Sequence, residues 1–182
     1  TGDFDGDGRV DLVVTQLSVQ SHTAAWWIAF GSASGDFVPG PVQGVLPTGF
    51  QGDSWVLAGD VTGDGAPDVL MSYSNTFGPP GSGFVCYRNL GGGTFAAPLH
   101  TPGGVPWLQN SSALGDWNGD GVLELVSITI DSSATGHEVR RWTWQAGTFV
   151  GNTALALPAY ANQITVGDVT GDGLADTLVG CA

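Results

Sequence analysis

The sequence predicts an all-β protein built from repeated small sheets, and three observations lead to this fold class. A cluster rich in Asp and Gly occurs four times, and the first residues of successive clusters are 57, 56 and 52 positions apart. Each cluster runs directly into a short apolar segment of β-forming residues. No helical periodicity of any length is present. A fixed period near 55 residues is the signature of a repeat architecture. The clusters are residues 3–11, 60–68, 116–124 and 168–176, with the shared template D-x-[DNT]-G-D-G-x-x-[DE].

Four strands are expected in each repeat. The strand after each cluster is expected at 12–14, 69–71, 125–128 and 177–179. An aromatic strand follows at 25–30, 84–88 and 139–144, and a Gly-containing hairpin turn at 34–37, 91–95 and 146–149. A last strand, at 54–58, 112–114 and 164–166, leads back to the next cluster. The repeats are therefore 3–59, 60–115 and 116–167, with a partial fourth at 168–182.

Composition supports a folded chain and excludes several functions. The 182 residues include 30 Gly, 17 acids, four Arg and no Lys, with a net charge of −13 and 42% apolar residues. That apolar share is enough to form a core, so the chain is not expected to be disordered. Without Lys, Schiff-base chemistry and a phosphate-loop lysine are excluded. Four Arg cannot neutralise a run of phosphates, which argues against nucleic acid. No apolar run reaches about 18 residues, so no membrane span is expected.

The clusters have the chemistry of a calcium site. Several carboxylates in one short loop repel one another unless a hard cation lies among them, and Ca²⁺ takes six to eight oxygen ligands. Template positions 1, 3 and 5 would supply side-chain oxygens, position 7 a backbone carbonyl and position 9 a carboxylate. The glycines at positions 4 and 6 would adopt positive φ. The candidate ligands are Asp3, Asp5, Asp7, Arg9 and Asp11; Asp60, Thr62, Asp64, Ala66 and Asp68; Asp116, Asn118, Asp120, Val122 and Glu124; and Asp168, Thr170, Asp172, Leu174 and Asp176. Thr62 and Thr170 carry no charge, so those two sites should be weaker.

Other interpretations of the clusters fit the sequence less well. An Asp-Gly turn without an ion is the simplest, but four repeats of the same spacing disfavour it. An EF-hand loop needs Glu at position 12 and flanking helices, and position 12 is here Val14, Met71, Ser127 and Val179. The absence of His and Cys from the four clusters excludes zinc and copper there, and Mg²⁺ suits such a cage less well.

The four phrases GDFDGDGRVDLVV, GDVTGDGAPDVLM, GDWNGDGVLELVS and GDVTGDGLADTLV resemble the FG-GAP/VCBS repeats of integrin-α-type β-propellers. The phrase YRNLGGGTFAAP at 87–98 resembles the middle of a VCBS repeat. This resemblance implies that each repeat is one propeller blade of four antiparallel strands. It also implies a calcium loop between the first strands of the blade, with the ligands given above. Glu124 departs from the usual Asp, so coordination there is expected to shift.

Three full repeats and the first strand of a fourth do not close a propeller, which has about 4–8 blades. The sequence therefore predicts an incomplete propeller or part of a larger one. Either the chain is a piece of a longer protein, or identical chains complete one another head to tail. The sequence leaves both alternatives open.

No catalytic constellation is expected. His22, His100 and His137 are scattered and are assigned to the surface or to turns, and His137 and Glu138 would point to opposite faces of a strand. Trp55, Trp117, Trp142 and Trp144 fit packing between sheets, whereas Trp26 and Trp27 would face opposite ways. Cys86 and Cys181 are expected as buried free thiols, and Asn110 begins a weak glycosylation sequon.

The sequence thus predicts a calcium-binding, non-enzymatic module with up to four Ca²⁺ ions. Sites of roughly 10⁻⁴–10⁻³ M affinity suit millimolar extracellular calcium, so a secreted or cell-surface location is expected. The resemblance implies adhesion, protein binding or structural assembly, with a protein or further copies of the chain as partner. It also allows a carbohydrate-binding lectin, or an accessory propeller of a polysaccharide-active enzyme or toxin.

Overall fold

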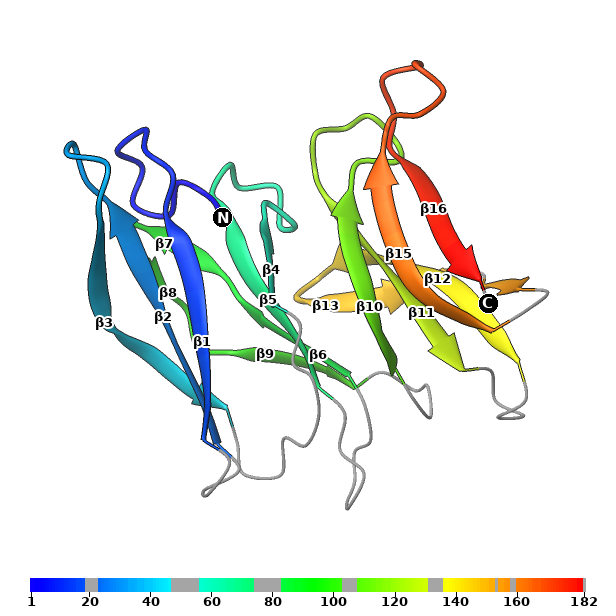
Figure 1. The fold of residues 1–182 in the computed structure, drawn as a ribbon, viewed down its shortest axis with the longest axis horizontal. Helices are drawn as coiled ribbons and strands as arrows, with labels where there is room; N and C mark the ends of the chain where they lie inside the picture. The colour runs from blue at the N-terminus through cyan, green and yellow to red at the C-terminus, as the bar shows by residue number, and fades with distance from the viewer. Residues whose placement is uncertain are drawn as a thin grey trace.

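The protein consists of strands and loops. The computed structural model describes residues 1–18, 23–46, 56–73, 83–102, 108–130, 136–152, 154–157 and 160–181. Strands are the only regular secondary structure within these ranges, and they form several small antiparallel sheets (Figure 1). No helix in the described ranges is long and apolar enough to cross a bilayer. The predicted all-β class is confirmed.

The first half of the chain forms two sheets and a hairpin. Sheet 1 has the order β1 (Leu12–Ser18), β2 (Thr23–Gly31) and β3 (Phe37–Leu46). Sheet 2 has the order β4 (Val56–Gly59), β5 (Asp68–Tyr73), β6 (Gly83–Tyr87) and β9 (Leu99–Pro102). Between β6 and β9, the strands β7 (Asn89–Gly91) and β8 (Thr94–Phe95) form a separate hairpin.

The second half repeats the plan. Sheet 3 has the order β10 (Leu108–Gly115), β11 (Glu124–Ile130), β12 (His137–Gln145) and β13 (Thr148–Gly151), and β14 (Leu155–Leu157) also pairs with β12. Sheet 4 consists of β15 (Ala161–Gly167) and β16 (Asp176–Cys181). Among the described residues, the repeat 3–59 holds the four expected strands, β1–β4. The repeat 60–115 holds six because of the added β7–β8 hairpin, and the repeat 116–167 holds five, β11–β15.

Each sequence repeat is out of phase with the sheets by one strand. The last strand of a repeat pairs with the first strand of the next, as Gly59 with Asp68 and Gly115 with Glu124 show. The same pairing joins Gly167 to Asp176, and an isolated bridge joins Gly2 to Asp11. Each Asp-rich loop therefore connects two backbone segments that pair with each other. All four loops lie along one edge of the molecule, at the top of Figure 1.

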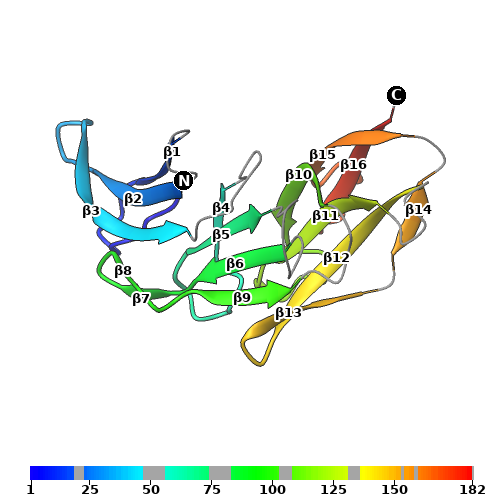
Figure 2. The same cartoon turned by 90° about the horizontal axis from the view of Figure 1, so that it is seen from below.

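The core lies between successive sheets, which stand side by side in chain order (Figure 2). One apolar cluster joins sheet 1 to sheet 2 through residues such as Trp26 and Met71. A second joins sheet 2 to sheet 3 through Phe84 and Trp142, and a third joins sheet 3 to sheet 4 through Ile128. Because strand side chains alternate between faces, each central sheet contributes to two of these clusters.

The described tryptophans lie in or beside this core as expected. Trp142 is buried, and Trp117 and Trp144 pack against the clusters as expected. Trp26 is fully buried whereas Trp27 is partly exposed, which agrees with their opposite orientation. Trp55 lies outside the described residues.

The cysteine and histidine assignments are only partly right. Cys86 is a free, buried thiol, whereas Cys181 is free but exposed, so its expected burial is wrong. It is the last residue of β16, which pairs with β15 in sheet 4. His100 is exposed, but His137 is half-buried within β12, where its ring lies 4.4 Å from that of Tyr160. His22 and the Asn110 side chain lie outside what the structure describes.

Candidate metal centre

The first Asp of each loop organises the loop backbone. In the first loop, Asp3 Oδ1 accepts hydrogen bonds from the Gly6 and Asp7 amides at 2.8 and 3.0 Å, and Asp3 Oδ2 accepts one from Gly8 at 2.8 Å. Asp60, Asp116 and Asp168 accept equivalent bonds from the glycine amides of their loops. These backbone bonds, the one from Gly121 above all, lower the pKa of Asp116. Position 1 is therefore a fixed carboxylate in all four loops.

The loop glycines adopt the backbone conformation that the sequence predicts. Both glycines of every loop have positive φ, from 76° at Gly63 to 86° at Gly65. An L side chain rarely adopts this conformation, so only Gly fits these positions without strain. The resulting turns bring the amides of positions 4 to 6 around the first carboxylate.

The position-9 acid joins the loop to its sheet. Asp11 is fully buried, and its two oxygens accept hydrogen bonds from the Phe4 amide and the Gly31 amide, both at 2.8 Å. Asp68 is equally buried and binds the Val61, Thr62 and Asn89 amides. Burial raises the pKa of Asp68, and these amides partly oppose that shift.

The position-9 acid also accepts backbone amides in the third and fourth loops. Glu124 accepts a hydrogen bond from the Trp117 amide at 3.0 Å, so the longer side chain retains the contact. Asp176 accepts from Val169 and Thr170, and these bonds lower its pKa. The position-9 carboxylate is thus both a candidate ligand and a structural acceptor.

Three carboxylates converge in the first loop. One oxygen each from Asp3, Asp5 and Asp11 lie within 4.8 Å of one another. Among the residues that the structure describes, this is the only group of three or more His, Cys, Asp or Glu side chains with such spacing. Lost hydration raises the pKa of Asp5, and repulsion from Asp7, Asp11 and Asp3 adds to that shift. An all-oxygen cluster of this size and charge fits Ca²⁺.

The remaining ligand positions of the first loop are arranged differently. Asp7 does not join the group of three, because its carboxylate forms an ion pair with Arg9 and accepts a hydrogen bond from the Arg9 amide at 2.9 Å. The Arg9 guanidinium also donates to the Gly31 carbonyl at 2.9 Å. In every loop the position-5 acid accepts a hydrogen bond from the position-7 amide. Coordination by the carbonyls of Arg9, Ala66, Val122 and Leu174 stays a prediction.

The third position distinguishes the other loops. In the third loop, the Asn118 amide nitrogen donates to Asp120 and Glu124 at 2.9 and 3.0 Å, so a neutral donor lies between the two acids. Thr62 and Thr170 contribute their backbone amides to the position-9 acid. Asp64 and Asp172 are exposed. These loops offer fewer charges to a cation than the first loop.

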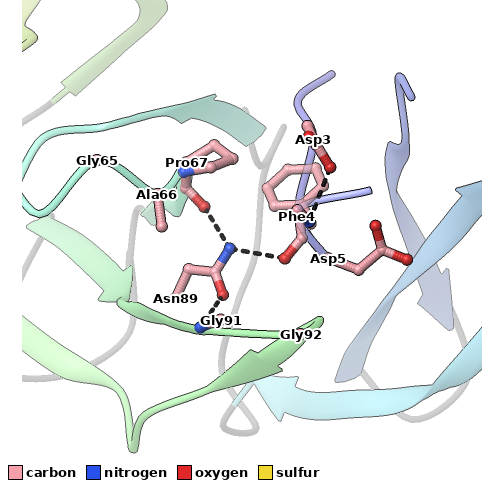
Figure 3. Close-up of a pocket in the computed structure, with 10 residues that line it drawn as sticks. Asp3, Phe4, Asp5, Gly65, Ala66, Pro67, Asn89, Gly91 and Gly92 are labelled. Atoms are coloured by element: carbon pink, nitrogen blue, oxygen red, sulfur yellow. Dashed lines mark hydrogen bonds between the residues drawn. The ribbon is translucent and has the colours of Figure 1, made fainter. Parts of the chain in front are cut away.

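Asn89 is a further residue of the site, and no pattern in the sequence indicated it. It is 3% exposed, and its amide nitrogen donates to the Phe4 carbonyl at 3.0 Å and to the Pro67 carbonyl at 3.2 Å (Figure 3). It therefore bridges the first and second loops. A cavity of about 220 Å³ lies between these loops, lined by Asp3, Asp5 and Asn89 among others. The pattern YRNLGGGTF around Asn89 indicated only a likeness to a repeat, because a contact between residues 85 positions apart, here Asn89 and Phe4, has no local signal.

Comparison with known proteins bears on this geometry. Residues 3–71 match the family model of the FG-GAP-like repeat. The first two loops, sheet 1 and the first strands of sheet 2 belong to that match. The resemblance stated from the four phrases is thereby confirmed for this part of the chain. No curated protein matches the chain.

Proposed function

We propose that the chain is a calcium-binding module of the β-propeller type, in which each sheet is one blade. The observation that carries this proposal is the convergence of Asp3, Asp5 and Asp11, whose oxygens lie within 4.8 Å of one another in an FG-GAP-like repeat. Asp3, Asp5 and Asp11 would hold the strongest ion. The other three loops, with Thr or Asn at position 3, would bind calcium more weakly because they carry less charge.

Calcium would relieve a large electrostatic cost. Four ions would change the net charge from −13 to −5, since each adds two positive charges. Thirteen of the 17 acids lie in the four loops, all along one edge of the molecule. A bound ion supplies positive charge and oxygen coordination there, and the loop residues hold their carboxylates in place through backbone amides. Rigid loops on a stack of sheets are a suitable surface for binding a partner.

The role we propose is adhesion, protein binding or structural assembly, and not catalysis. Loops of this kind bind calcium at roughly 10⁻⁴–10⁻³ M, a range that extracellular calcium occupies and cytosolic calcium does not. A secreted or cell-surface location follows from that affinity.

Calcium titration of two matched variants tests the proposal. Asp5→Asn removes one charge from the group of three, and Asp36→Asn removes one charge from the β2–β3 turn, outside all four loops. Titration calorimetry of the chelator-treated protein should show that Asp5→Asn weakens the tightest site at least about tenfold, or 1.4 kcal/mol. Asp36→Asn should bind calcium as the unaltered chain does. Equal affinities in all three proteins, or no calcium binding at millimolar concentration, would refute the proposal.

One observation favours carbohydrate binding as a second candidate function. A cavity of about 230 Å³ between the second and third loops is lined by Trp144 together with Asn118, Asp120 and Glu124. An aromatic side chain beside polar oxygens is suited to a sugar ring. A glycan array would reveal such binding, and Trp144→Ala should abolish it while Trp27→Ala, on sheet 1, should not. An array without signal would remove this candidate.

A further inference from the structure

The first Asp-rich loop differs from the other three because it carries a basic side chain. The chain has four Arg and no Lys, and Arg9 is the one basic residue within the four loops. It occupies position 7, where the other loops have Ala66, Val122 and Leu174. A positive side chain within a loop that gathers carboxylates competes with any cation for them.

Two contacts hold the Arg9 side chain in place. Its guanidinium forms an ion pair with the Asp7 carboxylate, and its Nε donates a hydrogen bond to the Gly31 carbonyl at 2.9 Å. Gly31 is the last residue of β2, and its amide donates to Asp11 Oδ1 at 2.8 Å. A Cβ on Gly31 would overlap the Val10 carbonyl oxygen, so the strand and the loop are in close contact there. The guanidinium is therefore held between the end of β2 and Asp7.

The side chain of Arg9, and not the backbone, distinguishes this loop. The Arg9 amide donates to Asp7 Oδ1 at 2.9 Å, and the equivalent bond from position 7 to position 5 is present in the other three loops. The ion pair with the other oxygen of Asp7 has no equivalent at Ala66, Val122 or Leu174, which carry no charge. Asp7 lies outside the group of three carboxylates that converge in this loop.

The charge and exposure of the pair fit a reversible contact. Arg9 places one positive charge among the four carboxylates of the loop, so it offsets part of their mutual repulsion while opposing the approach of another cation. The side chains of Arg9 and Asp7 are 46% and 27% exposed. An ion pair with this much access to water contributes little to stability. A competing cation can therefore break it at a small cost.

We propose that Arg9 is a built-in competitor at the first metal centre, whose guanidinium pairs with Asp7 in the calcium-free chain and lowers the calcium affinity of that loop. The inference rests on the proposed function, because it concerns the loop in which calcium would bind. It gives Arg9 two opposite roles, since its side chain opposes a cation whereas its backbone carbonyl is a candidate ligand. A cation gains the Asp7 carboxylate only at the expense of the ion pair.

Calcium titration calorimetry of Arg9→Gln is the direct test. The substitution removes the guanidinium and keeps the backbone carbonyl. It should tighten one site at least about tenfold, or 1.4 kcal/mol, and that site should be the one that Asp5→Asn weakens. Arg88→Gln is the matched control, because it removes an exposed positive charge outside all four loops. The control should bind calcium as the unaltered chain does.

A double-mutant cycle with Asp7→Asn tests whether Arg9 acts through Asp7. Without the carboxylate of residue 7, the guanidinium has no acid to withhold from a cation. The gain in affinity from Arg9→Gln should therefore be at least about threefold smaller in the Asp7→Asn chain than in the unaltered chain. Equal gains in the two chains would show that Arg9 does not compete for Asp7 and would overturn the proposal.

Thermal unfolding gives a second readout that does not depend on resolving the sites by calorimetry. At a calcium concentration well above both dissociation constants, the tighter site of Arg9→Gln should make the calcium-induced rise of its unfolding midpoint about 3–6 °C larger than that of the unaltered chain. Circular dichroism in chelator confirms that each variant is folded. An equal or smaller rise would contradict a competitor.

The outcomes separate this inference from the proposed function. If the unaltered chain binds calcium and Arg9→Gln binds it no more tightly, the inference is overturned and the proposed function stands. If the unaltered chain shows no binding at millimolar calcium but Arg9→Gln binds, the proposed function fails and the inference stands, with Arg9 as a complete block. Absence of binding by both proteins would overturn both.

Discussion

Asp11 and Asp5 belong to the same loop and carry the same charge, but they differ in what they bind. Asp11 is fully buried and accepts one amide from its own loop and one from Gly31 at the end of β2. Asp5 accepts an amide only two residues away, from Asp7 at 3.1 Å. The variants Asp11→Asn and Asp5→Asn each remove one charge from the same loop. Comparing their free energies of unfolding therefore separates the effect of hydrogen bonds from that of charge repulsion.

With chelator present, Asp11→Asn should lower the free energy of unfolding by about 1–3 kcal/mol, since an amide NH₂ cannot accept from the donors that the carboxylate satisfies. Asp5→Asn should leave stability unchanged or raise it, because the folded state disfavours the charged form. Urea unfolding at neutral pH measures both values. If Asp5→Asn proves as destabilising as Asp11→Asn, the assignment of the two roles is wrong.

The sign of the pH dependence follows from the same shift. The folded-state pKa of Asp5 is raised, so its favourable contribution is present at low pH and is lost as the pH rises through that value. Without calcium, the Asp5→Asn variant should therefore not show this loss of stability as the pH rises.

The two cysteines differ in reactivity for reasons of burial. Burial raises the pKa of the Cys86 thiol, and the negative charge of Asp68 adds to that effect, so its thiolate is scarce at pH 8. Cys181 is exposed on β16. A thiol reagent at pH 8 should label one cysteine in the native protein and two after unfolding, with Cys181→Ser removing the native signal. Labelling of Cys86 in the native state would contradict its burial.

At the scale of elements, the β7–β8 hairpin holds the first two loops together. Asn89 donates across to Phe4 and Pro67, and the Gly93 amide also donates to the Phe4 carbonyl at 3.0 Å. At the other loops, a position-8 amide donates to the position-1 carbonyl of the preceding loop, as Leu123 does to Asp60 and Ala175 does to Asp116. Pro67 is at position 8 of the second loop and has no amide hydrogen, so the interface between sheets 1 and 2 lacks this bond. The Asn89 side chain substitutes for that bond.

Asn89→Ala should therefore loosen sheet 1 from sheet 2. Losing the bridge should cost about 1–3 kcal/mol, because the Pro67 carbonyl loses its buried donor. Hydrogen exchange by mass spectrometry should show faster exchange in residues 1–18 than in sheet 3. Leu90→Ala, an exposed neighbour, is the control and should change neither quantity by more than about 0.5 kcal/mol. Uniform acceleration in every sheet would argue against a local bridge.

The sequence predicted the elements well where the signal is local. The strand after each loop, the aromatic strands and the hairpin turns all lie at the expected residues, because alternation and Gly-containing turns report short-range geometry. The positive φ of Gly6 and Gly8 followed from the same logic. What the sequence did not predict depends on distant partners. Examples are the bridge from Asn89, the pairing of Asp7 with Arg9 in place of a ligand position, and the exposure of Cys181.

At the scale of the whole molecule, stability depends on contacts between nearest neighbours. Among the described residues, the apolar clusters join each sheet to the sheet before or after it, which is the arrangement of a one-dimensional array. The Asp-rich loops impose a cost on every unit of that array, since 13 acids gather along one edge. Because this repulsion acts on all four loops, relieving it should raise the free energy of global unfolding.

Calcium and salt should therefore both reduce the repulsion between the loop carboxylates. In chelator, the midpoint of thermal unfolding should rise with NaCl concentration, because salt screens repulsion between the loops. Calcium at ten times the dissociation constant of one site should add about 1.4 kcal/mol, or about 3–6 °C, and should flatten the salt dependence as the charge falls from −13 toward −5. Tryptophan fluorescence during heating measures both effects.

Magnesium chloride at equal concentration is the control and should shift the midpoint less, because Mg²⁺ demands a stricter geometry and retains its water. Equal shifts with the two ions would mean that the loops are screened by any divalent cation and hold no calcium site.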